Sequence, residues 1–436
     1  MEFDERISTR QGLLAISPIA VFLVLYLAVS IAIGDFYKMP LALAFIIAAV
    51  WAVLSIKGKR ISERIEIFTR GAANTDVLYM IWIFIMAGAF SALAKGVGSI
   101  EATVSLTMSA LPTHYLVPSL FIASCFISLS IGTSVGTVVA LTPFAVELAQ
   151  ATGGDIPFFV AVTLCGSFFG DNLSFISDTT IASTRSQKCK MNDKFKANLW
   201  IAIPAAVIAV VLFTVVGNFH APTFQQSQAS AWLVTPYLLV VFFAIIGVNV
   251  LVVLSIGIMS CIIFSLLCTD IPLINMCSFM GDGIDGMGNL IIVTLLASGL
   301  LEVIRHNGGI QYIIQILTDR ISGVRGAQAC ISLVVSIVNI CTANNTVAII
   351  TVGQIAQRIS KQFNLDNRKV ASLLDTCSCI VQCIIPYGAQ ALLASGIAQV
   401  TPVAFFPYLY YAWALAFMVA LSIIFRFPRY KTTPKP

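Results

Sequence analysis

The chain has 436 residues, of which 58% are hydrophobic and only 10% are charged, with a mean hydropathy of +0.94 and a net charge of +5. A soluble domain carries about 25% charged residues, so this composition excludes an ordinary soluble protein. It predicts a polytopic membrane protein surrounded by the lipid bilayer.

The first part of the chain contains apolar runs that approach the roughly 20 residues needed to cross a bilayer. These runs are 13–33, 39–56 and 76–94. A tight turn at 34–38 joins the first two. Five Lys and Arg residues lie within 57–70, and we expect this basic loop to be cytoplasmic. Residues 95–112 are amphipathic and predict a helix along the membrane surface.

Residues 115–150 are too long for one span and are interrupted at 131–137 by glycine, serine and threonine. They form either one kinked crossing or a re-entrant hairpin, because such backbone is tolerated at membrane depth only where protein or a cavity satisfies it. A second basic loop at 185–196, which includes Lys194, lies inside only if 115–150 turns back. We therefore predict the hairpin.

An apolar run at 156–169 continues into a polar stretch that has no lysine or arginine before Arg185. The stretch contains Asp171, Asn172, Ser174, Ser177, Asp178, Thr179 and Thr180. We predict a helix over 156–184 that breaks near Gly170. Ionisable groups at membrane depth are costly, so they normally face a cavity and bind an ion or substrate.

Carboxylates, hydroxyls and backbone carbonyls are the ligands that small hard cations prefer. A carboxylate in a partly dry cavity can also take up a proton. A site that holds either a sodium or lithium ion or a proton is the minimum that antiport requires. We assign this site to Asp171 and Asp178, which would bind sodium.

A crossing at 197–216 completes the first part of the chain, and an outer loop at 218–230 follows it. The second part repeats the pattern. Its predicted segments are two crossings within 231–268 separated by a turn at 247–249, an outer acidic loop at 270–288, a crossing at 289–304, a hairpin at 327–356 with its tip at 339–346, a helix at 370–400 broken at 386–388, and a final crossing at 404–425.

The two halves align without gaps at an offset of 211 residues. Gly88 then falls on Gly299, Asp155 on Asp366, and both interruptions coincide. Each half holds five crossings and one hairpin, and an odd number of crossings inverts the second half. We predict an all-α membrane protein of two inverted repeats, 1–218 and 219–436, with the site where the broken segments meet.

The motif from Gly170 to Thr180 closely resembles the signature of the NhaC family of sodium/proton antiporters, within the ion-transporter superfamily. The resemblance implies sodium/proton exchange and paired hairpins. Phe175 stands where that pattern usually has proline, and this departure bears on ion selectivity. The equivalent position of the second half, Pro386, keeps the proline. The family also includes sodium-coupled exchangers of small organic acids.

The alternative is therefore a sodium- or proton-coupled carrier of a small carboxylate or amino acid, which helix N-termini would bind. No arginine lies within a predicted span to pair with a substrate carboxylate, which favours the cation. An ion channel would need a continuous pore, and the inverted repeat argues against it. No nucleophile and base pair or metal set indicates an enzyme, and no cofactor is expected.

The remaining candidates are polar residues near the breaks. The hairpin tips contribute Thr133, Ser134, Thr137, Asn344, Asn345 and Thr346. The hydroxyls of Ser174, Ser177 and Thr179 either bind the cation or bond back to helix carbonyls. Asp375 is either a proton relay or the ion-pair partner of Arg368.

Every basic cluster falls on one side in this topology. We therefore expect a multi-pass protein of the cytoplasmic membrane with both termini in the cytoplasm. The expected partners are sodium or lithium ions, protons and lipid. No nucleic acid is expected, and a homodimer is one option for the oligomeric state.

Overall fold

The computed structural model describes residues 7–33, 40–110, 112–174, 177–217, 231–318 and 321–428. All regular secondary structure within these ranges is helical. Nine helical segments in the described part of the chain, three of which combine two consecutive helices, are long and apolar enough to cross a membrane, or up to eleven if each of two bent pairs is one span. The prediction of an all-α polytopic membrane protein is confirmed.

The described helices of the first half are α1 (Thr9–Ile33), α2 (Leu41–Ser55), α3 (Ile61–Ala72), α4 (Thr75–Gly96), α5 (Ser99–Ala110), α6 (Thr113–Ile131), α7 (Ser134–Thr152), α8 (Ile156–Leu173), α9 (Asp178–Gln187) and α10 (Met191–Val216). The predicted basic loop at 57–70 is wrong in part, because α3 occupies most of it. Glu63 accepts from the backbone N–H of Arg60, and Glu66 pairs with Arg70 one turn on, so polar residues stabilise this helix.

The described helices of the second half are the 3-10 helix η1 (Ala231–Val234), α11 (Thr235–Ile245), α12 (Val250–Cys268), α13 (Leu273–Gly286), α14 (Gly288–His306), α15 (Gly309–Thr318), α16 (Gly323–Thr342), α17 (Asn345–Gln362), α18 (Asn367–Ile384), α19 (Ala389–Ala398), the 3-10 helix η2 (Pro402–Tyr408) and α20 (Tyr410–Ile424). The predicted acidic loop at 270–288 is wrong, since α13 fills it. A Cβ at Gly283 of α13 would overlap the carbonyl oxygen of Gly88 in α4, so glycine lets the two helices pack at backbone contact.

Each predicted hairpin segment consists of two helices that are separated by two residues. Gly132, with a φ of 74°, and Thr133 separate α6 from α7. Ala343, with a φ of 49°, and Asn344 separate α16 from α17. Left-handed backbone has no steric cost for glycine but a steric cost for alanine. The backbone of the second tip, at Ala343, is therefore more strained than that of the first, at Gly132.

The helix bounds recur at the offset of 211 residues. Adding 211 to the bounds of α8 and α9 produces the bounds of α18 and α19. A tertiary contact recurs as well. Ser128 Oγ donates to the carbonyl of Ser167 at 2.5 Å, and at the equivalent positions Asn339 Nδ2 donates to the carbonyl of Ser378 at 2.8 Å.

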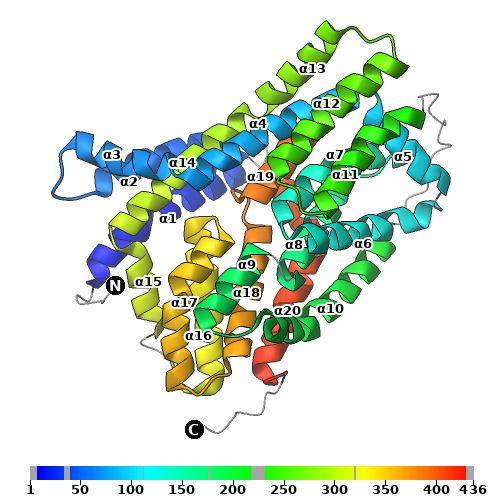
Figure 1. The fold of residues 1–436 in the computed structure, drawn as a ribbon. Coiled ribbons are helices and arrows are strands. Elements are labelled where there is room, and N and C mark those ends of the chain that lie inside the picture. Colours follow the sequence, from blue (N-terminus) through cyan, green and yellow to red (C-terminus); the bar gives the residue numbers. More distant parts are fainter. Residues whose placement is uncertain are drawn as a thin grey trace.

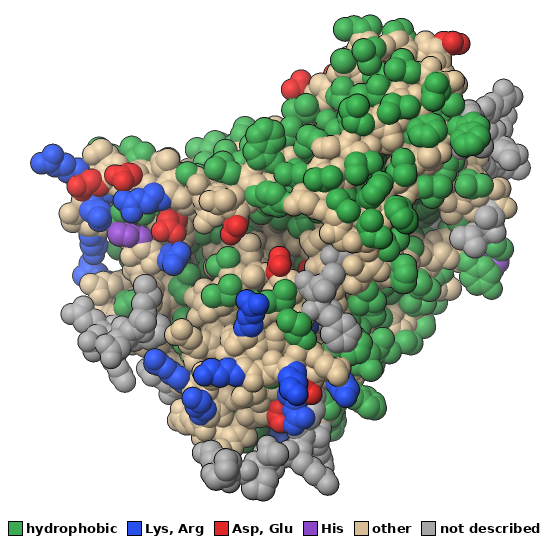
Figure 2. Space-filling model, in the orientation of Figure 1, with side chains coloured by type: hydrophobic (Ala, Val, Ile, Leu, Met, Phe, Trp, Pro, Cys, Tyr) green, Lys and Arg blue, Asp and Glu red, His purple; other side chains and the backbone are tan. Residues whose placement is uncertain are grey.

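The broken helices lie at the centre of the molecule. Every residue of α8 from Phe158 to Leu173 is buried, whereas most residues of α10 are not. In Figure 1, α4, α12, α13 and α14 lie above the level of α16, α17, α18 and α20. Figure 2 shows hydrophobic side chains over the upper right of this face and lysine and arginine gathered at its lower and left parts. The predicted turn at 34–38, the loop at 218–230 and the end of the basic tail beyond residue 428 lie outside the described residues.

Candidate functional site

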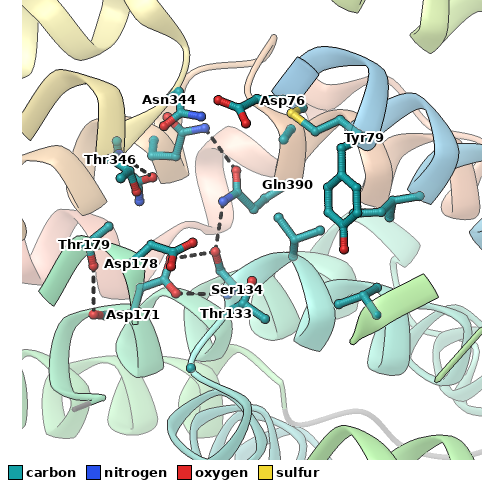
Figure 3. Close-up of a pocket in the computed structure, with 18 of the residues that line it drawn as sticks. Asp76, Tyr79, Thr133, Ser134, Asp171, Asp178, Thr179, Asn344, Thr346 and Gln390 are labelled. Carbon is teal, nitrogen blue, oxygen red and sulfur yellow. Dashed lines mark hydrogen bonds between the residues drawn. The ribbon is translucent and has the colours of Figure 1, made fainter. Parts of the chain in front are cut away.

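A pocket of about 550 Å³ lies where the two helix breaks meet the two hairpin tips (Figure 3). Its polar lining residues come from both halves of the chain. They are Asp76, Tyr79, Thr133, Ser134, Asp171, Asp178, Thr179, Asn249, Asn344, Asn345, Thr346, Gln382 and Gln390. The segments whose sequences are interrupted therefore converge on one cavity.

Asp171 lies at the C-terminal end of α8 and faces the first turn of α7. Its Oδ1 accepts from the backbone N–H of Ser134 at 2.9 Å, and its Oδ2 accepts from Ser134 Oγ at 2.5 Å. The N-terminus of α7 also carries a partial positive charge that stabilises a nearby anion. The carboxylate is only 4% exposed, so these contacts replace most of its hydration.

A chain of side-chain amides links this carboxylate to the second hairpin tip. Gln390 Nε2 donates to Ser134 Oγ at 2.9 Å, and Gln390 Oε1 accepts from Gln382 Nε2 at 3.0 Å. Gln382 Nε2 also lies 3.0 Å from the carbonyl oxygen of Ala343. Movement of either hairpin tip would therefore change the hydrogen bonds of the Asp171 carboxylate.

The pocket is acidic. Asp178 begins α9 and Asp76 lies in the first turn of α4. Both side chains are exposed, and both line the pocket together with the buried Asp171 (Figure 3). Among the described residues that line the pocket there is no lysine or arginine. Three carboxylates without a basic partner in the lining attract cations and repel anions.

Hydroxyl groups hold the break between α8 and α9 open. The carbonyl of Asp171 accepts from Ser177 Oγ at 2.9 Å and from Thr179 Oγ1 at 3.2 Å. The carbonyl of Ser174 accepts from Thr180 Oγ1 at 2.8 Å. Backbone that leaves a helix at membrane depth must find such partners. Phe175 lies outside the described residues.

A second polar centre lies behind the break, on the side of α10. Lys194 Nζ lies 2.8 Å from Asp375 Oδ2 and 2.8 Å from the carbonyl oxygen of Asn172, and both side chains of the ion pair are at most 1% exposed. The assignment of Lys194 to a basic loop is thus wrong. The pairing of Asp375 with Arg368 is also wrong, since Arg368 binds Asp366 at 2.6 Å.

The sequence model of the Na+/H+ antiporter family matches residues 7–218 and 223–427. The chain belongs to that family.

This antiporter-family chain is a multi-pass membrane protein, and its resemblance to the NhaC family is confirmed. It is 24% identical to the Na(+)/H(+) antiporter NhaC of Alkalihalophilus pseudofirmus, over 78% of this chain and 80% of that protein. It is 22% identical to the malate-2H(+)/Na(+)-lactate antiporter of Bacillus subtilis, over 93% of each. The solved structure of the YdaH transporter of Alcanivorax borkumensis has a TM-score of 0.42 and 12% identity, covering 81% of this chain and 88% of that one.

The antiporter-family chain brings most of its sequence-predicted site residues to the pocket. Those in its lining are Thr133, Ser134, Asp171, Asp178, Thr179, Asn344, Asn345 and Thr346. Asn172 and Asp375 lie in the second centre instead. Thr137, Ser174 and Ser177 are not in the lining, and their hydroxyls donate to the backbone carbonyls of Thr133, Leu129 and Asp171.

Several residues of the two polar centres were not predicted as site residues from the sequence. Gln382 carried a signal, because it aligns with Asp171 at the offset of 211. Asp76 lies at the end of the predicted crossing 76–94, and its exposed side chain is in the pocket lining. Nothing near Lys194 distinguishes it from its basic neighbours, except that Asn198 follows four residues later on the same helical face.

Proposed function

We propose that this chain exchanges sodium or lithium ions for protons by alternating access, and that the pocket is the exchange site. The observation that carries the proposal is the pairing of Asp171 and Asp178 at one helix break, in a lining whose described residues include no basic side chain. Carboxylate, hydroxyl and amide oxygens in this lining suit a hard cation.

Competition for the two carboxylates would couple the two ions. When sodium is bound, it neutralises the deprotonated carboxylates, and when sodium leaves, a proton takes its place. Only the neutralised site is cheap to carry through the membrane interior. The amide chain through Gln390 and Gln382 supports this scheme, because it joins the carboxylate of the first half to the hairpin tip of the second.

The architecture that would move the site is the pair of inverted repeats, 1–218 and 219–436. The recurrence of helix bounds at an offset of 211 residues supports the repeat. The basic segments support a cytoplasmic location for 57–70, 185–196 and 357–369, and for both termini. We place the protein in the cell membrane, surrounded by lipid, with a homodimer as one option.

The alternative cargo is a small carboxylate. The volume of about 550 Å³ exceeds the need of a bare ion, and the malate and lactate antiporter relative is named for such substrates. The acidic lining argues against it, since a carboxylate substrate would meet three aspartates with no arginine or lysine among the described lining residues. The sodium/proton assignment is therefore the better supported.

Flux in proteoliposomes tests the proposal. The purified protein is reconstituted with a pH-sensitive dye inside, and sodium, lithium, potassium, malate or lactate is added outside. Sodium or lithium alone should move protons, and Asp178→Asn should abolish this flux. The matched control is Asp270→Asn, because Asp270 is an exposed aspartate outside the pocket lining. Proton flux that requires malate or lactate would favour the alternative.

A further inference from the structure

Lys194 is fully buried in the first turn of α10, and its ammonium group contacts three oxygen atoms of different kinds. They are the carbonyl oxygen of Asn172 at 2.8 Å, the hydroxyl oxygen of Thr180 at 2.7 Å and a carboxylate oxygen of Asp375 at 2.8 Å. Carbonyl, hydroxyl and carboxylate oxygens are also the ligands that hard cations take from proteins.

The group of side chains around this ammonium has the character of a built site. Asn198 Nδ2 donates to Asp375 Oδ2 at 2.8 Å and to Asn172 Oδ1 at 2.9 Å, and Thr376 Oγ1 donates to Asn172 Oδ1 at 3.1 Å. Asn198 is 0% exposed, and its Oδ1 accepts no hydrogen bond from any residue that the structure describes. A further acceptor oxygen is therefore available among the same residues.

The second centre borders the pocket through consecutive residues. Asp171 directs its carboxylate to Ser134 and the pocket, and the next residue, Asn172, directs its carbonyl oxygen to Lys194. Burying Asp375 requires a positive charge beside it, because an uncompensated buried charge is strongly destabilising. Lys194 supplies this charge from within the chain.

We propose that the Lys194 ammonium is a tethered cation that fills a second cation site, formed by Asn172, Thr180 and Asp375, beside the exchange site. A tethered charge cannot be released during transport, so this site would stay loaded while the cation at Asp171 and Asp178 exchanges. Removing the lysine side chain while keeping its oxygen partners would convert the site into one that a free sodium or lithium ion can occupy. That the site stays loaded during exchange rests on the proposed function, whereas occupation of the site by an ion is tested separately, through stability.

The experiment measures the Tm of the full-length protein in detergent, in sodium, lithium, potassium or choline chloride at equal ionic strength. Lys194→Ala should have a lower Tm than the wild type in choline, and sodium or lithium should raise it by at least about 3 °C more than they raise the wild type. The double variant Lys194→Ala/Asp375→Asn should lose this additional rise, because the carboxylate ligand is gone.

Lys194→Arg is the matched control, since it keeps a tethered positive charge in the place of the ammonium. An additional sodium-specific rise in Lys194→Arg would overturn the proposal. Equal stabilisation of Lys194→Ala by potassium, choline and sodium would also overturn it. So would a Lys194→Ala protein that folds in none of these salts while Lys194→Ala/Asp375→Asn folds. Failure of wild-type sodium/proton flux would instead count against the proposed function.

Discussion

Ser134 contacts Asp171 through both of its hydrogen-bond donors, the backbone N–H and the side-chain hydroxyl. One residue at the start of α7 therefore holds both oxygens of the carboxylate that we assign to ion exchange. The hydroxyl also accepts from Gln390 of the second half. The conformation of this serine thus depends on both halves of the chain.

Substituting the carboxylates is the most direct test of the exchange site. Asp171→Asn removes the negative charge and replaces one of the two oxygens that accept from Ser134 by an NH2 group, so it should weaken apparent sodium affinity by about 10- to 100-fold. Asp178→Asn should abolish sodium-dependent proton flux while leaving the protein folded. Dye-based flux between pH 6 and 9 measures both. Wild-type rates in both correctly inserted variants would place the coupling site elsewhere.

The link between the halves can be measured as a coupling energy. Ser134→Ala and Gln390→Ala each break the hydrogen bond between these side chains, so their effects on apparent sodium affinity should not add. We expect a coupling of about 0.5–3 kcal/mol in a double-mutant cycle. Ser134→Thr retains the hydroxyl and serves as the control. Additive effects would mean that the amide chain does not participate in ion binding.

Asp76 should act through its charge. It is exposed in the pocket lining on α4, so Asp76→Asn should lower apparent sodium affinity at low ionic strength. The effect should shrink in about 0.5 M choline chloride, because salt screens exposed charges. Flux titrations at two ionic strengths measure this difference. An effect of the same size at both would indicate a direct ligand.

A pH-dependent contribution to stability should come from the N-terminus of α18. Burial alone would raise the pKa of the Asp366 carboxyl, but hydrogen bonds from Arg368 outweigh it and the net pKa is lowered. A lowered folded-state pKa means that this stabilisation is present above the unfolded-state pKa and is lost as the pH falls through the folded-state pKa.

Asp366 also caps α18 by accepting from the backbone N–H of Arg368 at 2.9 Å. Asp366→Ala should therefore lower the free energy of unfolding by about 1 kcal/mol at neutral pH. The difference from the wild type should begin to narrow near about pH 4, where the unfolded-state carboxyl becomes protonated, and should be lost at the lower pH where the folded-state carboxyl is protonated. Thermal unfolding across pH measures it. A difference that grows in acid would contradict the assignment.

The proposed orientation is open to labelling. Lys361 and Asp270 are both exposed, and Cys277 is the exposed native cysteine among the described residues. In a Cys277→Ser background, a membrane-impermeant thiol reagent applied outside intact cells should label Asp270→Cys and leave Lys361→Cys unmodified. Opening the cells should expose Lys361→Cys. The reverse pattern would invert the proposed topology.

The helical fold and the location of the pocket could be predicted because their signals are local. Long apolar runs indicate membrane-spanning helices, and clusters of glycine and polar residues indicate breaks in those helices, as at 131–137. Helices occupy most of 57–70 and 270–288, where we predicted loops. A polar or acidic sequence can still form a helix when its other face packs against the protein.

The composition of the site was less predictable because its contacts join distant residues. Lys194 resembles its basic neighbours, and its partner Asp375 lies in the other half of the chain. The role of Gln390 depends on a hydroxyl that is 256 residues away in sequence. No local pattern encodes such pairs.

The buried pair of Lys194 and Asp375 also has a consequence for biosynthesis. The lysine is synthesised long before the aspartate that neutralises it, and an unpaired ammonium group within the bilayer is costly. The N-terminal turn of α10 must therefore stay near the membrane surface, where Lys194 is hydrated, until α18 has been inserted. The inward movement of this turn then follows the insertion of α18, so the first half alone cannot reach its final packing.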